Sequence, residues 1–301
     1  MPTITEQARA TPDKPAFIMG ASGEVVTFAE LDAKANQIAQ LLRASGIQTG
    51  QHIAMMLKNC REFIEVVFGC SRAGVVFTPI STHLKKEETA YIINNCNARL
   101  FIASASLADV ATEAAEHAPE LLRKFIVGGE TAGFEDWQSA VASQPSHEIS
   151  DQSLGVPMLY SSGTTGKPKG IFRAPQNTDL DAPHPLKLVG AYYGFSDATV
   201  YLSPAPLYHS APLFYNTLNM TGGGTSVIME RFDPEQALAL IERYEVTHSQ
   251  WVPSMFIRML KLPEGIRERY DVSSMQRAIH AAAPCPIDIK RQMINWWGPV
   301  I

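Results

Sequence analysis

The fold of this chain is constrained most by a regular alternation of short apolar segments with amphipathic segments. Apolar runs at 52–57 and 75–79 have the length and composition of buried strands. Segments 62–72 and 85–95 carry apolar residues at the spacing of helices that bury one face. Apolar strands that alternate with such helices predict an α/β fold, in which helices cover both faces of a mostly parallel sheet.

The same alternation continues along the chain and resumes after residue 199. Further strands are expected at 99–103, 124–127, 199–202, 225–229, 246–251 and 277–280, and further helices at 31–42, 107–117, 234–244, 253–261 and 287–297. With 301 residues, the chain is long enough for more than one compact unit. The irregular stretch 174–185, which contains three prolines, is the expected boundary between two units.

Composition argues against several classes of partner and site. The formal net charge of −5 and the pI of about 5.9 leave no electrostatic footprint for nucleic acid. No apolar stretch approaches the roughly 18 residues of a membrane span, so no integral membrane segment is expected. The first residues lack the basic and apolar regions of a signal peptide, which predicts a cytoplasmic location. The four cysteines show no CxxC pairing, which favours free thiols over a zinc site.

A second feature, the run from Tyr160 to Ile171, carries the strongest functional signal. Its glycines let the backbone approach a ligand closely, and its N–H groups, hydroxyls and ammonium groups suit a polyphosphate. Pro168 interrupts a regular strand or helix and keeps the loop open. The candidate phosphate-binding residues are Ser161, Ser162, Gly163, Thr164, Thr165, Gly166, Lys167 and Lys169. The alternative is a surface turn rich in Gly, Ser and Lys, which the order and density of these groups disfavour.

The run is not a Walker A loop. That motif needs a glycine, four further residues and then Gly-Lys-Ser/Thr, whereas Ser161 stands in place of the first glycine and Pro168 follows the lysine. The sequence SSGTTGKPKG resembles the phosphate-binding signature of the adenylate-forming (AMP-binding) superfamily, which includes acyl-CoA synthetases. This resemblance implies that the loop holds the β- and γ-phosphates of ATP. It also implies a Mg²⁺ ion, with Thr164 or Thr165 nearest to the metal.

The resemblance extends over the chain and implies an αβαβα layering of two stacked αβ subdomains. Residues of about 51–180 would form the first subdomain, and 1–50 together with 186–301 the second. The run Pro206-Leu-Tyr-His-Ser-Ala-Pro212 resembles the acyl-substrate motif of acyl-CoA synthetases. By itself His209 could be a general base, a metal ligand, an aromatic wall or a half-buried structural residue. The resemblance implies a gate or wall between the acyl and CoA sites, beside Tyr208.

Two further segments resemble pocket-forming parts of the same superfamily. Trp251, Ser254 and Met255 match a strand-to-helix turn that lines the acyl pocket, although a strand-end Trp is also a common core anchor. The adenine-binding segment would consist of Ala281, Ala282, Ala283 and Pro284, with Ala281 where glycine is usual. No acidic residue lies between Leu202 and Met229 to pair a substrate ammonium, which disfavours an amino acid and favours a carboxylic acid with an apolar tail.

The implied reaction is the activation of a fatty, aryl or ring acid by ATP and its transfer to CoA. A Tyr-Gly-x-Thr-Glu segment, a ribose-binding Asp and a small C-terminal domain with a catalytic Lys would be expected to follow residue 301. We therefore expect the N-terminal part of an acyl-CoA synthetase, with little ligase activity alone and no certain catalytic residue of its own. Two alternatives are a non-catalytic nucleotide-binding or scaffold protein and a P-loop-type NTPase. A homodimer is included among the expected assemblies.

Overall fold

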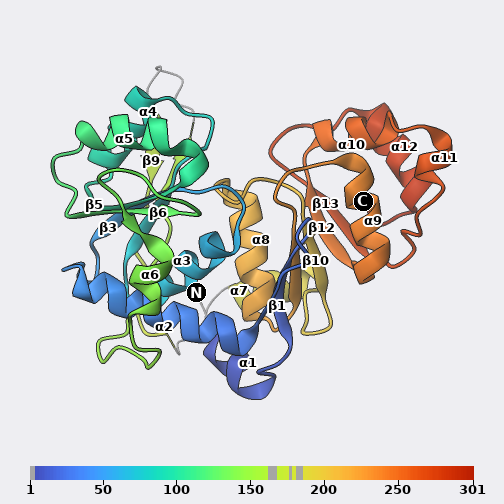
Figure 1. Cartoon of the computed structure of the whole chain (residues 1–301). Coiled ribbons are helices and arrows are strands. Elements are labelled where there is room, and N and C mark those ends of the chain that lie inside the picture. The colour runs from blue at the N-terminus through green and yellow to red at the C-terminus, as the bar shows by residue number, and fades with distance from the viewer. Residues whose placement is uncertain (1–3, 162–167, 176–177, 181–185) are drawn as a thin grey trace. The chain divides into compact units, whose positions relative to one another are not determined.

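The computed structural model describes residues 4–161, 168–175, 178–180 and 186–301. The chain divides into two compact units. Unit 1 consists of Met1–Glu6 and Ala29–His184, and unit 2 consists of Gln7–Phe28 and Pro185–Ile301. Each unit is built on its own sheet (Figure 1).

Unit 1 contains a five-stranded parallel sheet in which every strand is followed by a helix or a turn that returns the chain. The strands, in spatial order, are β4 (Val76–Pro79), β3 (His52–Met56), β5 (Ala98–Ser104), β6 (Arg123–Val127) and β7 (Glu135–Asp136). The helices are α2 (Phe28–Ala44, which enters the unit at Ala29), α3 (Arg61–Arg72), α4 (Lys86–Asn95), α5 (Ala108–Glu116) and α6 (Trp137–Ala142). A short η1 turn (Ala105–Leu107) precedes α5, and α1 (Thr5–Ala10) crosses the boundary near the N-terminus.

Unit 2 contains a six-stranded sheet whose first five strands are parallel, while the last pairs antiparallel. The strands, in spatial order, are β13 (Arg277–His280), β12 (His248–Trp251), β10 (Val200–Ser203), β11 (Thr225–Ile228), β1 (Pro15–Met19) and β2 (Val25–Thr27). The helices are α7 (Leu186–Tyr193), α8 (Ser210–Thr221), α9 (Pro234–Tyr244), α10 (Pro253–Leu260), α11 (Glu264–Arg267) and α12 (Ile287–Trp297).

Helices cover both faces of the unit 2 sheet (Figure 1). We call the face under α7 and α8 the α8 face, and the face under α9, α10 and α12 the α9 face. Tyr201 points to the α8 face, and its neighbour Leu202 belongs to the core of the α9 face. Neighbouring residues on a strand point to opposite faces, so both faces of β10 are buried.

The predicted fold class and most predicted elements are confirmed. The strand at 277–280 and the helices at 234–244 and 287–297 have the predicted bounds. The alternation missed α1, α6, α7, α8, α11, β1, β2 and β7, and it also missed a short hairpin described below. Residues 29–50 lie in unit 1, whereas residues 1–50 were expected with the second half of the chain. Tight packing of α2 on α3 accounts for this difference, because a Cβ at Gly69 would meet the Ile38 side chain at 2.4 Å.

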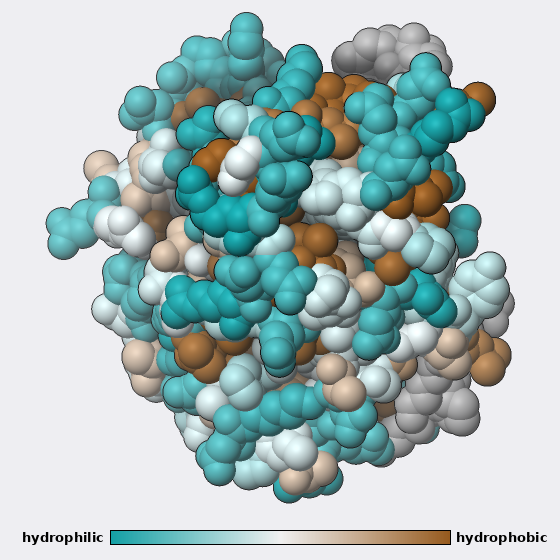
Figure 2. Space-filling model, turned by 90° about the vertical axis from the view of Figure 1, so that its right-hand side faces the viewer, coloured by the Kyte–Doolittle hydropathy of each residue, from teal (hydrophilic) through white to brown (hydrophobic). Residues whose placement is uncertain are grey.

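The face shown in Figure 2 is mostly hydrophilic, and hydrophobic residues show there only in small separate patches. Across the described parts of the chain, no helix is both long and apolar enough to span a bilayer. The cysteines are free thiols: Cys70 and Cys96 are buried, and Cys60 and Cys285 are partly exposed. Burial raises the pKa of the Cys70 thiol well above its usual range.

Candidate functional site

The candidate phosphate loop is flanked by the two strands of an antiparallel pair in unit 1. Strands β8 (Leu159–Ser161) and β9 (Lys169–Ile171) pair with Ser161 opposite Lys169. Six of the candidate residues, Ser162 to Lys167, lie outside the described residues. Ser161 and Lys169, the two candidate residues that are described, are both exposed.

The hairpin is anchored to the unit 1 core by the side chain of Tyr160. Its ring packs against the core cluster under α4 and α5, and its hydroxyl donates to Asn95 Oδ1 at 2.6 Å. Burial raises the pKa of the Tyr160 phenol, so the hydroxyl keeps its proton for this hydrogen bond. Gly170 lies directly against Tyr160, because a Cβ there would approach Cζ of the ring at 3.0 Å. A side chain at this position of β9 would therefore force Met158 and Tyr160 to shift.

In unit 2 the topology itself indicates where a ligand would bind. After β10 the chain continues to β11, on one side of the adjacent strands β10 and β12. After β12 it continues to β13, on the opposite side of this pair. β10 and β12 are neighbours, with Tyr201 opposite His248 and Leu202 opposite Ser249. In open α/β sheets, ligands bind outside the carboxyl ends of the strands at such a switch point. The segments after β10, β12 and β13 therefore form one candidate edge in unit 2.

His209 lies at this edge, immediately before α8. It is the N-cap residue of α8, with extended backbone, and its side chain is exposed. Its ring packs against the buried ring of Tyr208, with a centroid distance of 4.5 Å. The alternative of a half-buried structural histidine is therefore wrong. The position is compatible with a gate at the mouth of a site.

Trp251 and Met255 lie at the same edge but inside the core. Trp251 has an exposed fraction of 0% and Met255 of 8%, and both belong to the core of the α9 face. The indole N–H of Trp251 donates to Ser249 Oγ, and its ring meets Trp297 at 5.5 Å between centroids. The structure thus favours the core-anchor alternative for Trp251. Ser254, between them in sequence, is exposed.

The predicted adenine segment follows β13 at this edge. Ala281 is partly exposed, and Ala282, Ala283 and Pro284 are exposed. The N–H of Ala281 donates to the carbonyl of Trp251 at 3.1 Å, which ties the segment to the end of β12. Ala282 has φ of +73°, in the left-handed region that costs a non-glycine residue about 1–2 kcal/mol. A conformation this unfavourable needs support from its surroundings and is typical of functional turns.

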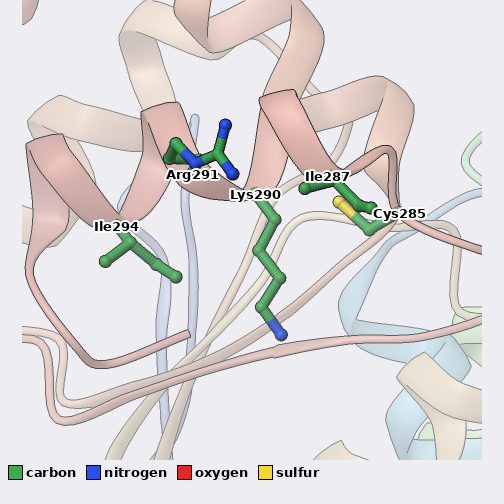
Figure 3. A pocket seen from close by; sticks show the side chains of 5 residues that line it. All are labelled: Cys285, Ile287, Lys290, Arg291 and Ile294. Atoms are coloured by element: carbon green, nitrogen blue, oxygen red, sulfur yellow. The ribbon is translucent and has the colours of Figure 1, made fainter.

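His280, the last residue of β13, contacts Lys290 of α12. The ammonium of Lys290 lies 3.3 Å from Nε2 of His280, so the imidazole accepts and stays neutral. Burial, followed by the charge of Lys290, lowers the pKa of His280. Figure 3 shows Lys290 extending from α12 beside a surface pocket of about 280 Å³. The other residues that line this pocket are Cys285, Ile287, Arg291 and Ile294.

The sequence analysis did not predict the buried polar side chains between α8 and the sheet. Asn216 donates from Nδ2 to Ser203 Oγ at 2.7 Å, and Asn219 donates from Nδ2 to Ser226 Oγ at 3.2 Å. The two asparagines are fully buried, and neither Oδ1 has a partner among the described residues. The available signal was their i, i+3 spacing, which places two amides on one helix face in an otherwise apolar segment.

No group of three His, Cys, Asp or Glu side chains that could hold a metal ion occurs within the described ranges. The metal expected from the sequence is a Mg²⁺ ion beside Thr164 or Thr165. Thr164 and Thr165, the two residues implied for this role, lie outside the described residues. Their hydroxyl oxygens are the hard ligands that magnesium prefers.

Both units consist of a sheet with helices packed on it, and in unit 2 the strand order reverses between β10 and β12. This is the architecture of a doubly wound α/β protein, which binds ligands at such a reversal. The chain belongs to the AMP-binding enzyme family, whose sequence profile matches residues 4–301. It is 27% identical to the fatty acid–[acyl-carrier-protein] ligase ScoC of Streptomyces coeruleorubidus over 94% of this chain and 53% of that protein. It is 29% identical to a feruloyl-CoA synthase of an Amycolatopsis species over 96% of this chain and 55% of that protein. The chain thus spans about half the length of the curated relatives it matches.

Solved structures of this family have the same fold. The anthranilate CoA ligase AuaEII, in complex with anthranoyl-AMP, matches with a TM-score of 0.85 at 22% identity. That match covers 99% of this chain and 58% of AuaEII. The N-terminal domain of FACL13 from Mycobacterium tuberculosis matches with a TM-score of 0.81 at 22% identity, over 98% of this chain and 72% of that one. Both likenesses establish the fold.

Proposed function

We propose that this protein activates a carboxylic acid with ATP and transfers the acyl group to CoA. The observation that carries the proposal is the run Tyr160 to Ile171, a phosphate-loop sequence mounted on a core-anchored hairpin. Membership of the AMP-binding enzyme family supports the same chemistry. The names of the relatives, which are ligases for fatty acids and for feruloyl groups, support an acid as the substrate.

The proposed reaction has two steps. First, a carboxylate oxygen attacks the α-phosphorus of ATP, and the bond from that phosphorus to the bridging oxygen breaks to release pyrophosphate. Then the CoA sulfur attacks the acyl carbon and loses its proton, while the carbon–oxygen bond to AMP breaks. Both steps concentrate negative charge, so oriented N–H, hydroxyl and ammonium groups stabilise their transition states. Residues Ser161 to Lys169 are proposed to hold the β- and γ-phosphates.

A magnesium ion would neutralise phosphate charge during the first step. We assign its protein ligand to the hydroxyl of Thr164 or Thr165. In unit 2 the exposed segment Ala281 to Pro284 would receive the adenine, because small side chains let a flat purine lie against the backbone. Tyr208, His209 and Ser254 would border the acid at the same edge. Trp251 and Met255 would support that border from the core, since both are buried.

The free thiols suit a reducing cytoplasm, which we propose as the location. We also propose a homodimer as the assembly, which light scattering would check.

Acid-dependent release of pyrophosphate tests the proposed function. The native polypeptide that carries these residues is incubated with ATP, Mg²⁺ and CoA, together with a panel of alkanoic and aromatic acids. We expect pyrophosphate and AMP with at least one acid, and almost none without acid. Lys169→Ala should weaken ATP binding about ten- to hundredfold, since a charge-assisted hydrogen bond contributes about 1.5–3 kcal/mol. Lys261→Ala, which removes another exposed lysine in unit 2, is the matched control.

Two other results would overturn the proposal. Release of ADP that does not depend on acid would point to a phosphatase or kinase type of NTPase. Binding of ATP without pyrophosphate release for every acid in the panel would point to a nucleotide-binding scaffold.

A further inference from the structure

A surface pocket of about 280 Å³ in unit 2 begins at the residue after the proposed adenine segment. It is lined by Cys285 and by four residues of α12, which are Ile287, Lys290, Arg291 and Ile294 (Figure 3). Drug-sized ligands occupy pockets of about 300–1,000 Å³, so this pocket suits a smaller molecule. A water molecule takes about 30 Å³ in the liquid, so a ligand of about nine non-hydrogen atoms would fill the pocket. A whole nucleotide is too large for this volume.

Most of the pocket wall is apolar. Ile287 has an exposed fraction of 75%, and Ile294 and Cys285 are partly exposed. Figure 3 shows Ile294 on one side of Lys290, and Ile287 and Cys285 on the other side. The methylene stem of Lys290 adds apolar surface between them. A ligand with a short apolar group would cover these side chains and remove them from water.

The pocket is also positively charged, because two of its five lining residues are basic and none is acidic. The Lys290 ammonium lies 3.3 Å from Nε2 of His280, which uses one of its three N–H donors and leaves two for a ligand. The Arg291 guanidinium pairs with Asp288 at 3.4 Å, and the two side chains are 68% and 85% exposed. A pair this exposed contributes little, so the charge of Arg291 still attracts an anion.

We propose that this pocket binds a small amphipathic anion, a carboxylate or a phosphate monoester that carries a short apolar group. The anionic group accepts hydrogen bonds from the ammonium of Lys290, and Arg291 adds to the attraction. The apolar group lies on Ile287, Ile294 and the side chain of Cys285. The site is distinct from the proposed acid and ATP sites.

Occupation of the pocket should also affect the proposed adenine segment. Cys285 directly follows this segment, and His280, which contacts Lys290, directly precedes it. A bound anion would therefore contact groups at both ends of the segment, in which Ala282 has an unfavourable φ of +73°. A ligand that holds both ends lowers the ordering cost that a nucleotide must meet on binding. This coupling rests on the proposed function, whereas binding of the anion does not.

The first experiment titrates hexanoate and butyl phosphate into the native polypeptide without ATP, by calorimetry. We expect a Kd on the order of 1 mM for ligands of this size. Hexanol and hexylammonium, which lack the negative charge, should bind at least tenfold more weakly, as should acetate and inorganic phosphate, which lack the apolar group. Binding of only one of the two anions would support the proposal and identify the charged group. Hexanol that binds as tightly as the two anions would overturn it.

Alkylation of Cys285 by iodoacetamide, followed by mass spectrometry of peptides, localises the ligand. Cys60, the other partly exposed cysteine, is the internal control. Saturating butyl phosphate should slow the alkylation of Cys285 at least threefold and leave that of Cys60 unchanged. An unchanged rate at Cys285 would place the ligand elsewhere and overturn the proposal.

Two variants test the charge and the apolar wall separately. Lys290→Met keeps the apolar stem and should weaken the binding of butyl phosphate at least tenfold, because a charge-assisted hydrogen bond is lost. Lys261→Met, at the exposed end of α10, is the matched control and should bind normally. Ile287→Ser changes an exposed side chain, so the fold should persist, and binding should weaken about threefold. Unchanged binding in either Lys290→Met or Ile287→Ser would contradict the proposal.

The coupling is measured as the Kd of ATP with and without saturating butyl phosphate, which has no carboxyl group to activate. We expect the Kd of ATP to fall at least twofold, and ATP to lower the Kd of butyl phosphate by the same factor. Lys290→Met should abolish this effect. An unchanged Kd, or a rise that persists in Lys290→Met through competition at the phosphate loop, would overturn the coupling. If no acid supports pyrophosphate release, the proposed function fails, and the titrations without ATP still decide whether the pocket binds an anion.

Discussion

The backbone carbonyl of Trp251 accepts a hydrogen bond from the N–H of Ala281, with 3.1 Å between the two atoms. Trp251 ends β12, and it lies opposite His280 at the end of β13. The bond therefore continues the parallel ladder one step beyond β13. The bond joins the turn after β12 to the proposed adenine segment through backbone atoms alone. Side chains in both turns can therefore be substituted without moving the backbone.

Ala282→Gly should stabilise the protein. The φ of +73° is unfavourable for alanine, and glycine adopts it without a steric penalty. We expect a gain of about 0.5–1 kcal/mol in the free energy of unfolding, after the greater entropy of glycine in the unfolded chain is subtracted. Urea denaturation measures this gain. Ala283→Gly is the matched control and should destabilise, because φ at Ala283 is not positive; equal effects of the two changes would contradict the argument.

Trp251→Ala should act on stability and not on the choice of acid. The side chain is fully buried in the α9-face core, so its truncation should cost about 3–5 kcal/mol of unfolding free energy. Trp251→Phe keeps much of the volume and should fold well enough for assay. Its relative kcat/KM values over an acid panel should equal those of the unmodified protein. A changed order of preference in Trp251→Phe would show that the indole does line the acid site.

The sequence was sufficient to predict the fold class because the signal repeats along the chain. The strand Arg277–His280 and the helices Pro234–Tyr244 and Ile287–Trp297 combine a clear period with a clear start, such as Asp233 before Pro234. By contrast, α8 begins within the segment Ser203–Pro212, where three prolines obscure the helical period. The strand β1 pairs with the nearby β2 and also with β11, more than two hundred residues away, so its place in the sheet could not be predicted from the residues around it.

For the candidate site, local motifs predicted which segments matter but not how deeply their side chains lie. The motif placed Trp251 in a pocket wall, yet the burial of an indole depends on partners such as Trp297 that are distant in sequence. The buried hydroxyl of Tyr201, which has no hydrogen-bond partner among the described residues, could not be predicted for the same reason, since an aromatic residue in a strand normally indicates core packing alone. Spacing along one segment carries no information on contacts made across the sheet.

Stability should fall as the pH drops below about 6.5, and His248 should contribute to this loss. Burial lowers the pKa of His248, whose Nε2 lies 3.2 Å from the carbonyl of Tyr193 and whose Nδ1 lies 2.9 Å from Thr247 Oγ1. The unfolded chain, with a His pKa of about 6.5, therefore binds more protons between that value and the lowered one. Stability is complete above pH 6.5 and is lost as the pH falls through this window.

Urea unfolding at pH 7.5 and 5.5 measures this loss. His248→Gln should reduce the difference between the two pH values. It should not abolish the difference, because burial also lowers the pKa values of His52 and His280. His83→Gln, at an exposed position, is the control. A difference that stays the same in His248→Gln would show that this ring titrates alike in the folded and unfolded states.

Tyr160→Phe should weaken ATP binding through the anchoring of the phosphate loop. The change removes the hydrogen bond to Asn95 Oδ1, and a net loss of about 0.5–1.5 kcal/mol is expected for such a bond. Part of that loss would appear as freedom at the start of the loop, next to Ser161. We expect the Kd for ATP to rise about two- to fivefold in calorimetric titrations. Asn95→Ala should reproduce this effect, and in the double variant the two effects should not add, because they remove one bond. Additive effects would mean that Tyr160 and Asn95 act on the loop independently.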